Sequence, residues 1–480
     1  MTASFTRDEL LQATGGPSTS LGVTVVGSLP ANVEGVSTDT RTIAKGNLFV
    51  ALKGETFDAN DFLDKAAAAG AAAAVVRKGA KIPAGLPCIE VDDTLAALGQ
   101  IARHHRRRFS IPLGAITGSN GKTTTKEMIG AILETRGPAL KTEGNLNNEV
   151  GVPLTLLRLD RSHTGAIIEM GMNHPGELAR LSAFTEPQVA QITIAAAAHL
   201  EFLGTVENVA KAKGEIYGGL PKDGLAIANG DDVLVRAQAK ACGKKVLLYG
   251  KCDDADVRLS EIVSHDADGL ALRIAWAGKK HLVRLKFVGE HNAINACGAF
   301  AMGVSLGCTA EQCVAGLEAS RPWAHRLSLH DAPNGVTVID DCYNANPSSM
   351  GAALDTLKSL AGTRRTVAVL GDMLELGATE SVLHRQMGEK AVANGVQVLV
   401  SFGPRSKAGW EAARASLGDR ALHVAATDKA EPAVEFLKAQ LKAGDVVLVK
   451  GSRGMKLERI VEALTGVGPS GHRTTKGGAH

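Results

Sequence analysis

The stretch Leu113-Gly-Ala-Ile-Thr-Gly-Ser-Asn-Gly-Lys-Thr-Thr124 decides the fold of the central part of this chain. Its first five residues predict a buried strand, and a helix is predicted from Thr123 onward. Glycines between a strand and a helix let backbone N–H groups close around phosphate oxygens, while Lys122 can neutralise β and γ phosphates and the Thr123 hydroxyl can bind Mg²⁺. The predicted nucleotide contacts are Gly118, Ser119, Asn120, Gly121, Lys122, Thr123 and Thr124.

This loop is a compact form of the P-loop. The general eight-residue pattern has a glycine five positions before Gly121, where this chain has Ile116, and the first glycine falls at Gly118 instead. A glycine-rich turn that merely precedes Lys-Thr is the alternative interpretation. The strand–loop–helix context favours the phosphate site.

Strands and helices alternate through the rest of the chain. From about residue 109 to 322 the pattern predicts a parallel sheet followed by antiparallel strands around a turn at 267–269, and from 323 to 466 it predicts another α/β sheet. Open α/β sheets bind ligands at the carboxyl ends of their strands. The predicted strands include Gly165–Glu169, Val189–Ile194, Leu225–Ala228, Val336–Ile339, Thr366–Leu370, Val396–Ser401 and Val446–Val449, with helices near Glu177 and from Asn292 and Thr309.

Residues 1–108 show short strands and turns instead. A capping box of Thr6 and Glu9 predicts a first helix, and the alanine-rich run Ala66–Ala74 predicts a second, because alanine is the strongest helix former. A third helix is predicted from Thr94 and ends in the basic cluster 103–108. We interpret this cluster as a helix C-terminus and not as a nucleic-acid site, since no second basic patch with interleaved aromatic residues accompanies it.

Length and composition set the class of protein. A chain of 480 residues favours about three domains, expected at 1–108, 109–322 and 323–466, with a polar, glycine-rich, disordered tail at 467–480. The net charge of +3 is too small for a protein that coats a polyanion. Seven cysteines without a Cys-x-x-Cys pair, no signal peptide and no long apolar run predict a cytoplasmic protein without membrane insertion.

The run 117–124 resembles the Mur ligase and folylpolyglutamate synthase superfamily. In similar enzymes ATP phosphorylates a carboxylate, and an amine then displaces the phosphate. The resemblance implies two Mg²⁺ ions. Glu169 ends a strand among apolar neighbours, where a lone carboxylate is costly unless it meets a cation. The implied metal-binding residues are Thr123, Glu169, His199 and Lys213, the last carrying a carbamate that supplies the oxygen ligands Mg²⁺ prefers. The alanine run 195–198 before His199 departs from the polar or glycine residues of relatives.

Further nucleotide contacts are implied on two other segments. Asn292 and Asn295 resemble the residues that contact the adenine side of ATP, although an Asn pair can also cap a helix. Arg326 matches an arginine that reaches the ATP phosphates, with a surface salt bridge as the alternative. The run 340–347 resembles a nucleotide-facing segment with Asp341, Tyr343 and Asn344. Contacts from a separate domain would make catalysis depend on closure. The implied catalytic residues are Lys122, Glu169, His199, Lys213 and Arg326.

Three segments resemble those that hold the other substrates. The first, with Ser37, Thr38, Asp39 and Arg41, is similar to a uridine-diphosphate-binding domain; Asn60 receives no role there, because relatives often place His at that position. The second resembles a muramoyl-peptide segment, although Asn-rich turns are common in loops. The third, 449–456, and the similar segment 370–377 both lie at strand ends, and the resemblance implies that they position a dipeptide. The implied contacts are Ser37, Thr38, Asp39, Arg41, Asn145, Asn147, Asn148, Lys450 and Ser452.

The resemblance implies a three-domain α/β enzyme: a small N-terminal UDP-binding domain, a central P-loop ATPase domain with a parallel sheet, and a C-terminal Rossmann-like domain. It implies a monomer that joins D-alanyl-D-alanine to UDP-N-acetylmuramoyl-tripeptide and binds no nucleic acid. The alternatives that stay open are another amino-acid-adding ligase or a folylpolyglutamate-type ligase of the superfamily, a P-loop kinase or nucleotide switch, and a non-catalytic binding protein. The third residue of the peptide and the general base are not assigned.

Overall fold

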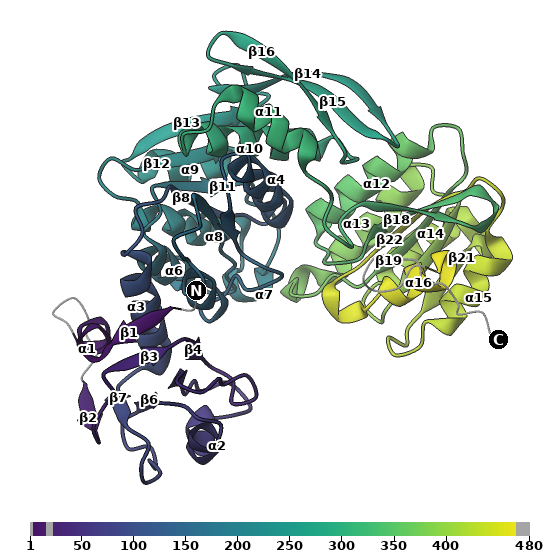
Figure 1. Cartoon of the computed structure of the whole chain (residues 1–480). Helices are drawn as coiled ribbons and strands as arrows, with labels where there is room; N and C mark the ends of the chain where they lie inside the picture. Colours follow the sequence, from purple (N-terminus) through teal and green to yellow (C-terminus); the bar gives the residue numbers. More distant parts are fainter. Residues whose placement is uncertain (1–2, 16–22, 467–480) are drawn as a thin grey trace, which may run out of the picture.

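The computed structural model describes residues 3–15 and 23–466 and contains three separate α/β bodies (Figure 1). The predicted disordered tail, 467–480, lies outside the described residues. A five-stranded sheet forms the N-terminal body, a nine-stranded sheet the central one and a six-stranded sheet the C-terminal one. The α/β fold class predicted from the sequence is therefore confirmed. Among the described helices none is both long and apolar enough to cross a membrane.

The central sheet has the strand order β16-β15-β14-β13-β12-β11-β8-β10-β9. Strands β8 to β13 and the start of β14 pair in parallel, and β14, β15 and β16 continue as an antiparallel meander. The strands are β8 Leu113–Thr117, β9 Ala139–Lys141, β10 Gly165–Glu169, β11 Val189–Ile192, β12 Leu225–Asn229, β13 Lys245–Gly250, β14 Val257–Asp266, β15 Gly269–Trp276 and β16 Lys279–Leu285.

Helices cover both faces of this sheet, and each face has its own buried apolar cluster. Parallel strands buried on both faces are apolar throughout, which explains why β8 and β10 read as continuous apolar runs. The helices are α4 Lys122–Glu134, α5 Gly151–Leu156, α6 Glu177–Thr185, α7 Leu200–Leu203, α8 Val206–Gly214, α9 Val233–Ala241, α10 His291–Ser305 and α11 Ala310–Ala319, with a 3₁₀ turn at Glu215–Gly219.

The C-terminal sheet has the order β17-β18-β22-β19-β20-β21, in which only β17 runs antiparallel to its neighbour. Apolar clusters again lie on both faces. Its strands are β17 Ser328–Ala332, β18 Val336–Asp341, β19 Thr366–Gly371, β20 Val398–Phe402, β21 Ala421–Val424 and β22 Val446–Lys450, and its helices are α12 Pro347–Ala361, α13 Glu380–Ala393, α14 Lys407–Leu417, α15 Glu431–Gln440 and α16 Glu458–Thr465.

The meander β14–β16 extends from the central body toward α12 of the C-terminal body (Figure 1). His265 at the end of β14 contacts α12, since its Nδ1 lies 3.1 Å from the Ser359 hydroxyl. The same ring accepts the backbone N–H of Gly289 through Nε2 at 3.0 Å. The meander therefore lies against the segment that enters α10.

The N-terminal body contains the sheet β2-β7-β6-β5-β4 and a two-stranded pair β1-β3. The predicted capping box is confirmed: the Glu9 N–H donates to the Thr6 hydroxyl at 3.2 Å, and the Thr6 N–H donates to the Glu9 carboxylate at 2.8 Å. The elements are β1 Ser4–Thr6, α1 Arg7–Gly15, β2 Thr24–Val26, β3 Asn32–Glu34, β4 Val36–Ser37, β5 Leu48–Val50, α2 Leu63–Ala68, β6 Ala73–Arg77, β7 Cys88–Val91 and α3 Thr94–Arg106, with a 3₁₀ turn at Ala59–Phe62.

The predicted helix over Ala66–Ala74 is wrong beyond its first turn. Helix α2 ends at Ala68, Gly70 adopts a left-handed backbone with φ +94°, and Ala73 and Ala74 begin strand β6. This strand pairs in parallel with both β5 and β7, and its residues 73–76 are completely buried. Burial between two strands outweighs the helix propensity of alanine, which amounts to less than about 1 kcal/mol per residue.

The basic cluster at the end of α3 is paired within the chain. Arg103 and Arg107 both bind Glu186 at 2.6 Å, and Arg108 binds Glu9 at 2.8 Å. The interpretation of the cluster as a helix C-terminus is confirmed. These pairs hold α3 against α1 and the end of α6.

Candidate active site

The P-loop joins β8 to α4, and two of its positions require glycine. A Cβ atom on Gly118, where φ is +153°, would lie 1.8 Å from the Thr193 hydroxyl, and one on Gly121, where φ is +80°, would lie 2.5 Å from the Asn295 amide oxygen. Gly121 directly precedes α4. The loop therefore presents backbone N–H groups at the N-terminus of a helix, which is an anion-binding arrangement.

A pocket of about 540 Å³ lies between this loop and the C-terminal body. It brings together all but one of the predicted nucleotide contacts. Gly118 is the exception, and its carbonyl accepts the Lys122 ammonium at 2.6 Å. The predicted residues that line the pocket are Ser119, Asn120, Gly121, Lys122, Thr123, Thr124, Asn292, Asn295, Arg326, Asp341, Tyr343 and Asn344.

Two contacts across the pocket join the central and C-terminal bodies. The Arg326 guanidinium donates to the Thr123 hydroxyl at 3.0 Å, and its carbon lies 4.2 Å from the centre of the Tyr343 ring. The Asn346 amide donates to the Asn120 side-chain oxygen at 2.7 Å. Arg326 makes no ion pair within residues 3–15 and 23–466, and its buried Nε has no hydrogen-bond partner there. A surface salt bridge is therefore not the role of Arg326 in this structure.

Asn292 and Asn295 do not cap the start of α10. The residue before this helix is Glu290, which makes no side-chain capping bond. Inside the first turn, the Asn292 amide donates to the Val288 carbonyl at 2.7 Å, and the Asn295 amide donates to the Asn292 side-chain oxygen at 2.8 Å. The helix-cap alternative is wrong, and Asn295 lies directly against the P-loop glycine Gly121.

Glu169, at the end of β10, has the properties of a cation ligand. Its side chain is buried, with one oxygen accepting the Asn147 amide at 2.9 Å. The other oxygen is buried and has no hydrogen-bond partner among the described residues. An unsatisfied buried carboxylate oxygen is costly unless a cation binds it, so this residue fits a Mg²⁺ ligand.

Lys213, on α8, is a buried amine in a cationic environment. Only 1% of its surface is exposed, and in the described part of the chain its ammonium makes no ion pair. Burial, together with the nearby charge of Lys122, lowers the pKa of Lys213 well below its ordinary value. A neutral amine is the form that adds to carbon dioxide, so the environment fits a carbamylated lysine. Burial also lowers the pKa of Lys122, where the Glu169 charge opposes the shift and Arg326 adds to it.

His199 lies at the start of α7 with a left-handed backbone, φ 55°. Its Nδ1 is 2.6 Å from a carboxylate oxygen of Glu375, on the segment that follows β19 in the C-terminal body. The Glu201 N–H also donates to the Glu375 carbonyl at 3.2 Å. No local pattern in the sequence points to Glu375, because its partner lies 176 positions earlier.

The predicted UDP contacts form a turn after β4 and do not line the pocket. Arg41 holds Asp39 through two nitrogens at 2.6–3.0 Å and, by these hydrogen bonds, lowers the pKa of Asp39 to about 2. Ser37 donates to the Asp39 carbonyl at 2.9 Å, and Thr38 lies between them partly exposed. Asn60 is buried and bonded to the backbone of Ala51 and Arg77, which agrees with leaving it without a ligand role.

The remaining substrate candidates fall into two environments. Asn148 accepts the N–H of Gly151 at 2.8 Å, at the start of α5, and Asn145 is exposed. Lys450 lines the nucleotide pocket and donates to Asp341 at 2.6 Å and to the Asn344 carbonyl at 3.0 Å. Ser452 is buried, with its hydroxyl accepting the N–H of Leu374 at 3.0 Å. Lys450 thus lies with the nucleotide contacts, and Ser452 supports the 370–377 segment.

Several pocket-lining residues were not predicted. Asn346 could have been found, because an Asn before Pro347 is a helix-start signal and Asn346 indeed caps α12. Asn229 ends the parallel strand β12, a position where ligands commonly bind. The others carry no local signal. The unpredicted polar residues include Thr193, Asn229, Asp231, Lys251, His291 and Asn346.

Comparisons with known proteins find matches over nearly the whole chain. Three family descriptions match successive parts of it: Mur ligase family, catalytic domain at residues 32–106; Mur ligase middle domain at 116–303; and Mur ligase, glutamate ligase domain at 325–453. The UDP-N-acetylmuramoyl-tripeptide--D-alanyl-D-alanine ligase of Escherichia coli (strain K12) is 40% identical over 436 residues, 90% of this chain and 94% of the relative. The enzyme of the same name from Bacillus subtilis (strain 168) is 38% identical over 437 residues, 90% and 93% of the two chains.

Solved structures give the same result. MurF from Acinetobacter baumannii superposes with a TM-score of 0.86 at 33% identity and covers 97% of this chain and 99% of its own. MurF ligase from Thermotoga maritima in complex with ADP superposes with a TM-score of 0.80 at 27% identity, covering 89% and 96%. All three bodies, in order along the chain, match one family, and this chain belongs to the Mur ligase family.

Proposed function

We propose that this protein is the ATP-dependent ligase that joins D-alanyl-D-alanine to UDP-N-acetylmuramoyl-tripeptide, a step of peptidoglycan precursor synthesis. The pocket between the P-loop and the segment of Arg326, Asp341 and Tyr343 carries the proposal, since it combines a phosphate-binding loop with a cation from a separate body. Relatives that share 38–40% identity over 90% of this chain bear the name of this activity.

The three bodies have distinct roles in this proposal. Residues 1–108 bind the uridine diphosphate through the turn of Ser37, Thr38, Asp39 and Arg41, whereas residues 109–322 bind ATP. Residues 323–466 supply Arg326 and Asp341 and, near Lys450 and Ser452, the dipeptide site. Asn145, Asn147 and Asn148 contact the muramoyl peptide. The enzyme acts as a monomer in the cytoplasm, where ATP is available.

In the first step the terminal carboxylate of the tripeptide attacks the γ-phosphorus of ATP. ADP leaves, and an acyl phosphate forms. Lys122 and Arg326 stabilise the negative charge on the transferred phosphoryl group, together with N–H groups of the loop 118–121. Arg326 is already within 3.0 Å of Thr123, so the two bodies need little further movement to bring its charge to the loop.

Two Mg²⁺ ions would be held by Thr123, Glu169, His199 and a carbamate on Lys213. Bound there, they would neutralise the phosphate oxygens. The unpaired oxygen of Glu169 and the depressed pKa of Lys213 support these assignments. Asn147 orients Glu169 through its amide.

In the second step the free amine of D-alanyl-D-alanine attacks the acyl carbon. The tetrahedral intermediate collapses to the amide and releases phosphate. Water must be kept out while the acyl phosphate exists, and the contacts Arg326–Thr123 and Asn346–Asn120 close this side of the pocket.

The test is a reaction with purified protein, ATP, Mg²⁺ and UDP-muramoyl tripeptide. One reaction contains D-alanyl-D-alanine and the other contains single amino acids, and the masses of the products are measured by mass spectrometry. We expect a new amide only with the dipeptide. ATP turnover without an amine would instead support a kinase or nucleotide switch, and product with a single amino acid would support another ligase of the family.

A further inference from the structure

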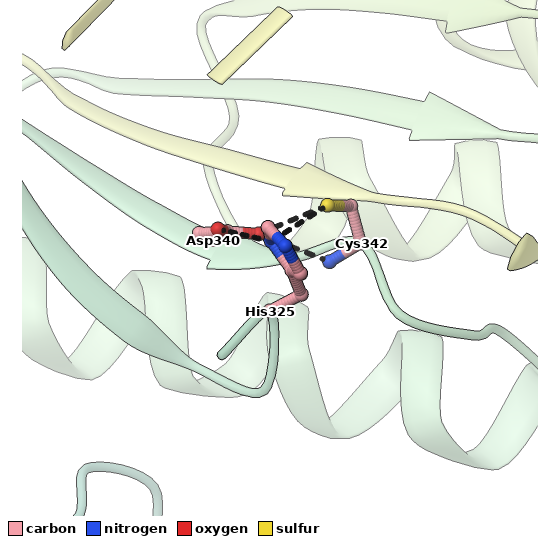
Figure 2. Close-up of side chains that lie close together, drawn as sticks. All are labelled: His325, Asp340 and Cys342. Carbon is pink, nitrogen blue, oxygen red and sulfur yellow. Dashed lines mark hydrogen bonds and ion pairs between the residues drawn. The ribbon is translucent and has the colours of Figure 1, made fainter. Parts of the chain in front are cut away.

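His325, Asp340 and Cys342 form a cluster of polar side chains, in which Asp340 and Cys342 are buried and His325 is partly buried (Figure 2). The two oxygens of Asp340 are used separately. One is 2.7 Å from the His325 Nδ1 and the other accepts the Cys342 thiol at 3.0 Å. His330 adds a third contact, with its Nε2 3.5 Å from the Asp340 carboxylate. Asp340 is 2% exposed and Cys342 is fully buried.

The cluster and the pocket alternate along the same two chain segments. His325 precedes Arg326 and Asp340 precedes Asp341, and the second residue of each pair lines the pocket. Successive side chains at the end of a strand point to opposite faces. Asp340 and Asp341 end β18, so Asp340 points away from the pocket while Asp341 lines it.

Arg326 stands on a strained piece of backbone. The residues on both sides of it, His325 and Leu327, adopt left-handed conformations with φ 63° and 52°. Residues other than glycine persist in this region only where neighbouring contacts hold them. Two hydrogen bonds do so here: the Tyr343 N–H donates to the His325 carbonyl at 3.1 Å, and the Leu327 N–H donates to the Asp341 carboxylate at 3.2 Å.

We propose that the His325–Asp340 pair is a clamp that holds this left-handed turn and thereby aims Arg326 at the phosphate-binding loop. His325 is a positioning residue, since it acts through Arg326 and does not line the pocket. The expected loss of catalytic activity rests on the proposed function, whereas the expected loss of nucleotide affinity does not.

The electrostatics of the pair agree with a permanent clamp. Burial alone would raise the pKa of Asp340, but hydrogen bonds from His325, His330 and Cys342 hold that pKa far below its usual range. The hydrogen bond to Asp340 raises the pKa of His325. A buried carboxylate with these partners is stable only while the partners stay in place, so the turn is held from behind by more than backbone bonds.

A metal site is the other interpretation of these side chains, because one ligand atom from each lies within 4.8 Å of the others. In a tetrahedral zinc site the ligand atoms would stand about 3.3–3.7 Å apart, as follows from the usual zinc–ligand distances. The separations from Asp340, 2.7 and 3.0 Å, are those of hydrogen bonds. The geometry therefore favours the hydrogen-bonded clamp.

The first experiment compares the His325→Ala and His325→Gly variants with the wild-type enzyme. Both lose the clamp, but glycine adopts a left-handed φ without strain. For His325→Ala we expect roughly a 10- to 100-fold loss in kcat/KM for ATP, the range for a lost hydrogen bond to a charged group. The kcat/KM of His325→Gly for ATP should lie between the values of His325→Ala and the wild-type enzyme. A folded alanine variant with wild-type kinetics, or a glycine variant slower than alanine, would overturn the proposal.

The second experiment asks whether His325 acts through Arg326. In the Arg326→Ala background, His325→Ala should cost less than about twofold, because coupled residues are not additive. Equal losses in both backgrounds would reduce His325 to a general structural role. The matched control is His423→Ala, which removes a half-buried histidine of the same body whose ring lies 5.8 Å from Trp410; it should preserve the ATP kinetics.

Nucleotide affinity separates this inference from the proposed function. Calorimetric titration of the full chain with a non-hydrolysable ATP analogue should show weaker binding in His325→Ala even if the wild-type enzyme forms no peptide product, and thermal unfolding checks that each variant is folded. Unchanged affinity for this analogue would count against the clamp. The last measurement is the zinc content of the protein after dialysis against Zn²⁺, for which we expect less than about 0.1 equivalent per chain. Stoichiometric Zn²⁺ that is lost in the Cys342→Ser variant would show a metal site in place of the clamp.

Discussion

Replacing Lys213 by Met should stabilise the ligand-free protein while it abolishes the ligase. Lys213 is 1% exposed and its ammonium has no ion-pair partner in the described residues. A buried polar group without a partner costs about 1–3 kcal/mol, and methionine fills a similar volume without that cost. Since 1 kcal/mol shifts the melting temperature of a body of about 150–250 residues by about 2–4 °C, we expect an increase of about 2–12 °C in Tm. Methionine cannot form a carbamate, so peptide formation should fall to background.

The pH dependence of the stability difference between Lys213→Met and the wild-type protein follows from the linkage between folding and proton binding. Burial and the Lys122 charge lower the folded-state pKa of Lys213 below its ordinary 10.5. The unfolded chain therefore binds the proton more tightly, and folding is penalised at every pH below the unfolded pKa. The penalty fades as the pH rises toward about 10.5. The stability advantage of Lys213→Met should thus be larger at neutral pH than in alkaline buffer.

Thermal unfolding of both proteins, with and without bicarbonate and Mg²⁺, tests this reasoning. Bicarbonate supplies carbon dioxide for the carbamate, so it should raise the Tm of the wild-type protein alone. Lys213→Arg serves as the matched control, because it keeps a cation in the same buried place and should be less stable than wild type. A methionine variant that melts below wild type at pH 7, or that retains its kcat, would refute the argument.

Three further outcomes are expected. Lys122→Ala should lower kcat by about 10²–10³, measured by product formation, because a preorganised charge on the transferred phosphoryl group is lost; wild-type turnover would contradict its role. Gly121→Ala should weaken ADP binding more than tenfold by calorimetry, since the new methyl group would lie 2.5 Å from Asn295 and φ is +80°; unchanged affinity would contradict the loop geometry. Glu375→Ala should raise the Mg²⁺ concentration for half-maximal activity, because the carboxylate that orients the His199 ring through Nδ1 is lost; an unchanged or lower value would show that the pair does not support metal binding.

Local patterns in the sequence determined much of this protein. The apolar run Leu113–Thr117 became a five-residue strand, and the residues after Gly121 became a helix, as their periodicity predicted. The capping box of Thr6 and Glu9 formed because both partners lie within one helical turn. Signals of this kind depend on the residues themselves and their immediate neighbours, and at these positions the surrounding fold agrees with them.

Contacts between distant segments were decided only by the tertiary structure. Arg326 reaches Thr123 across 203 positions, and Glu375 reaches His199 across 176, because the central and C-terminal bodies contact each other. The run Ala66–Ala74 divides between a helix and a strand for the same reason: two neighbouring strands bury its second half and outweigh the helix propensity of alanine. Propensity acts over a few residues with fractions of a kcal/mol, whereas burial and packing act between residues that the sequence does not place together.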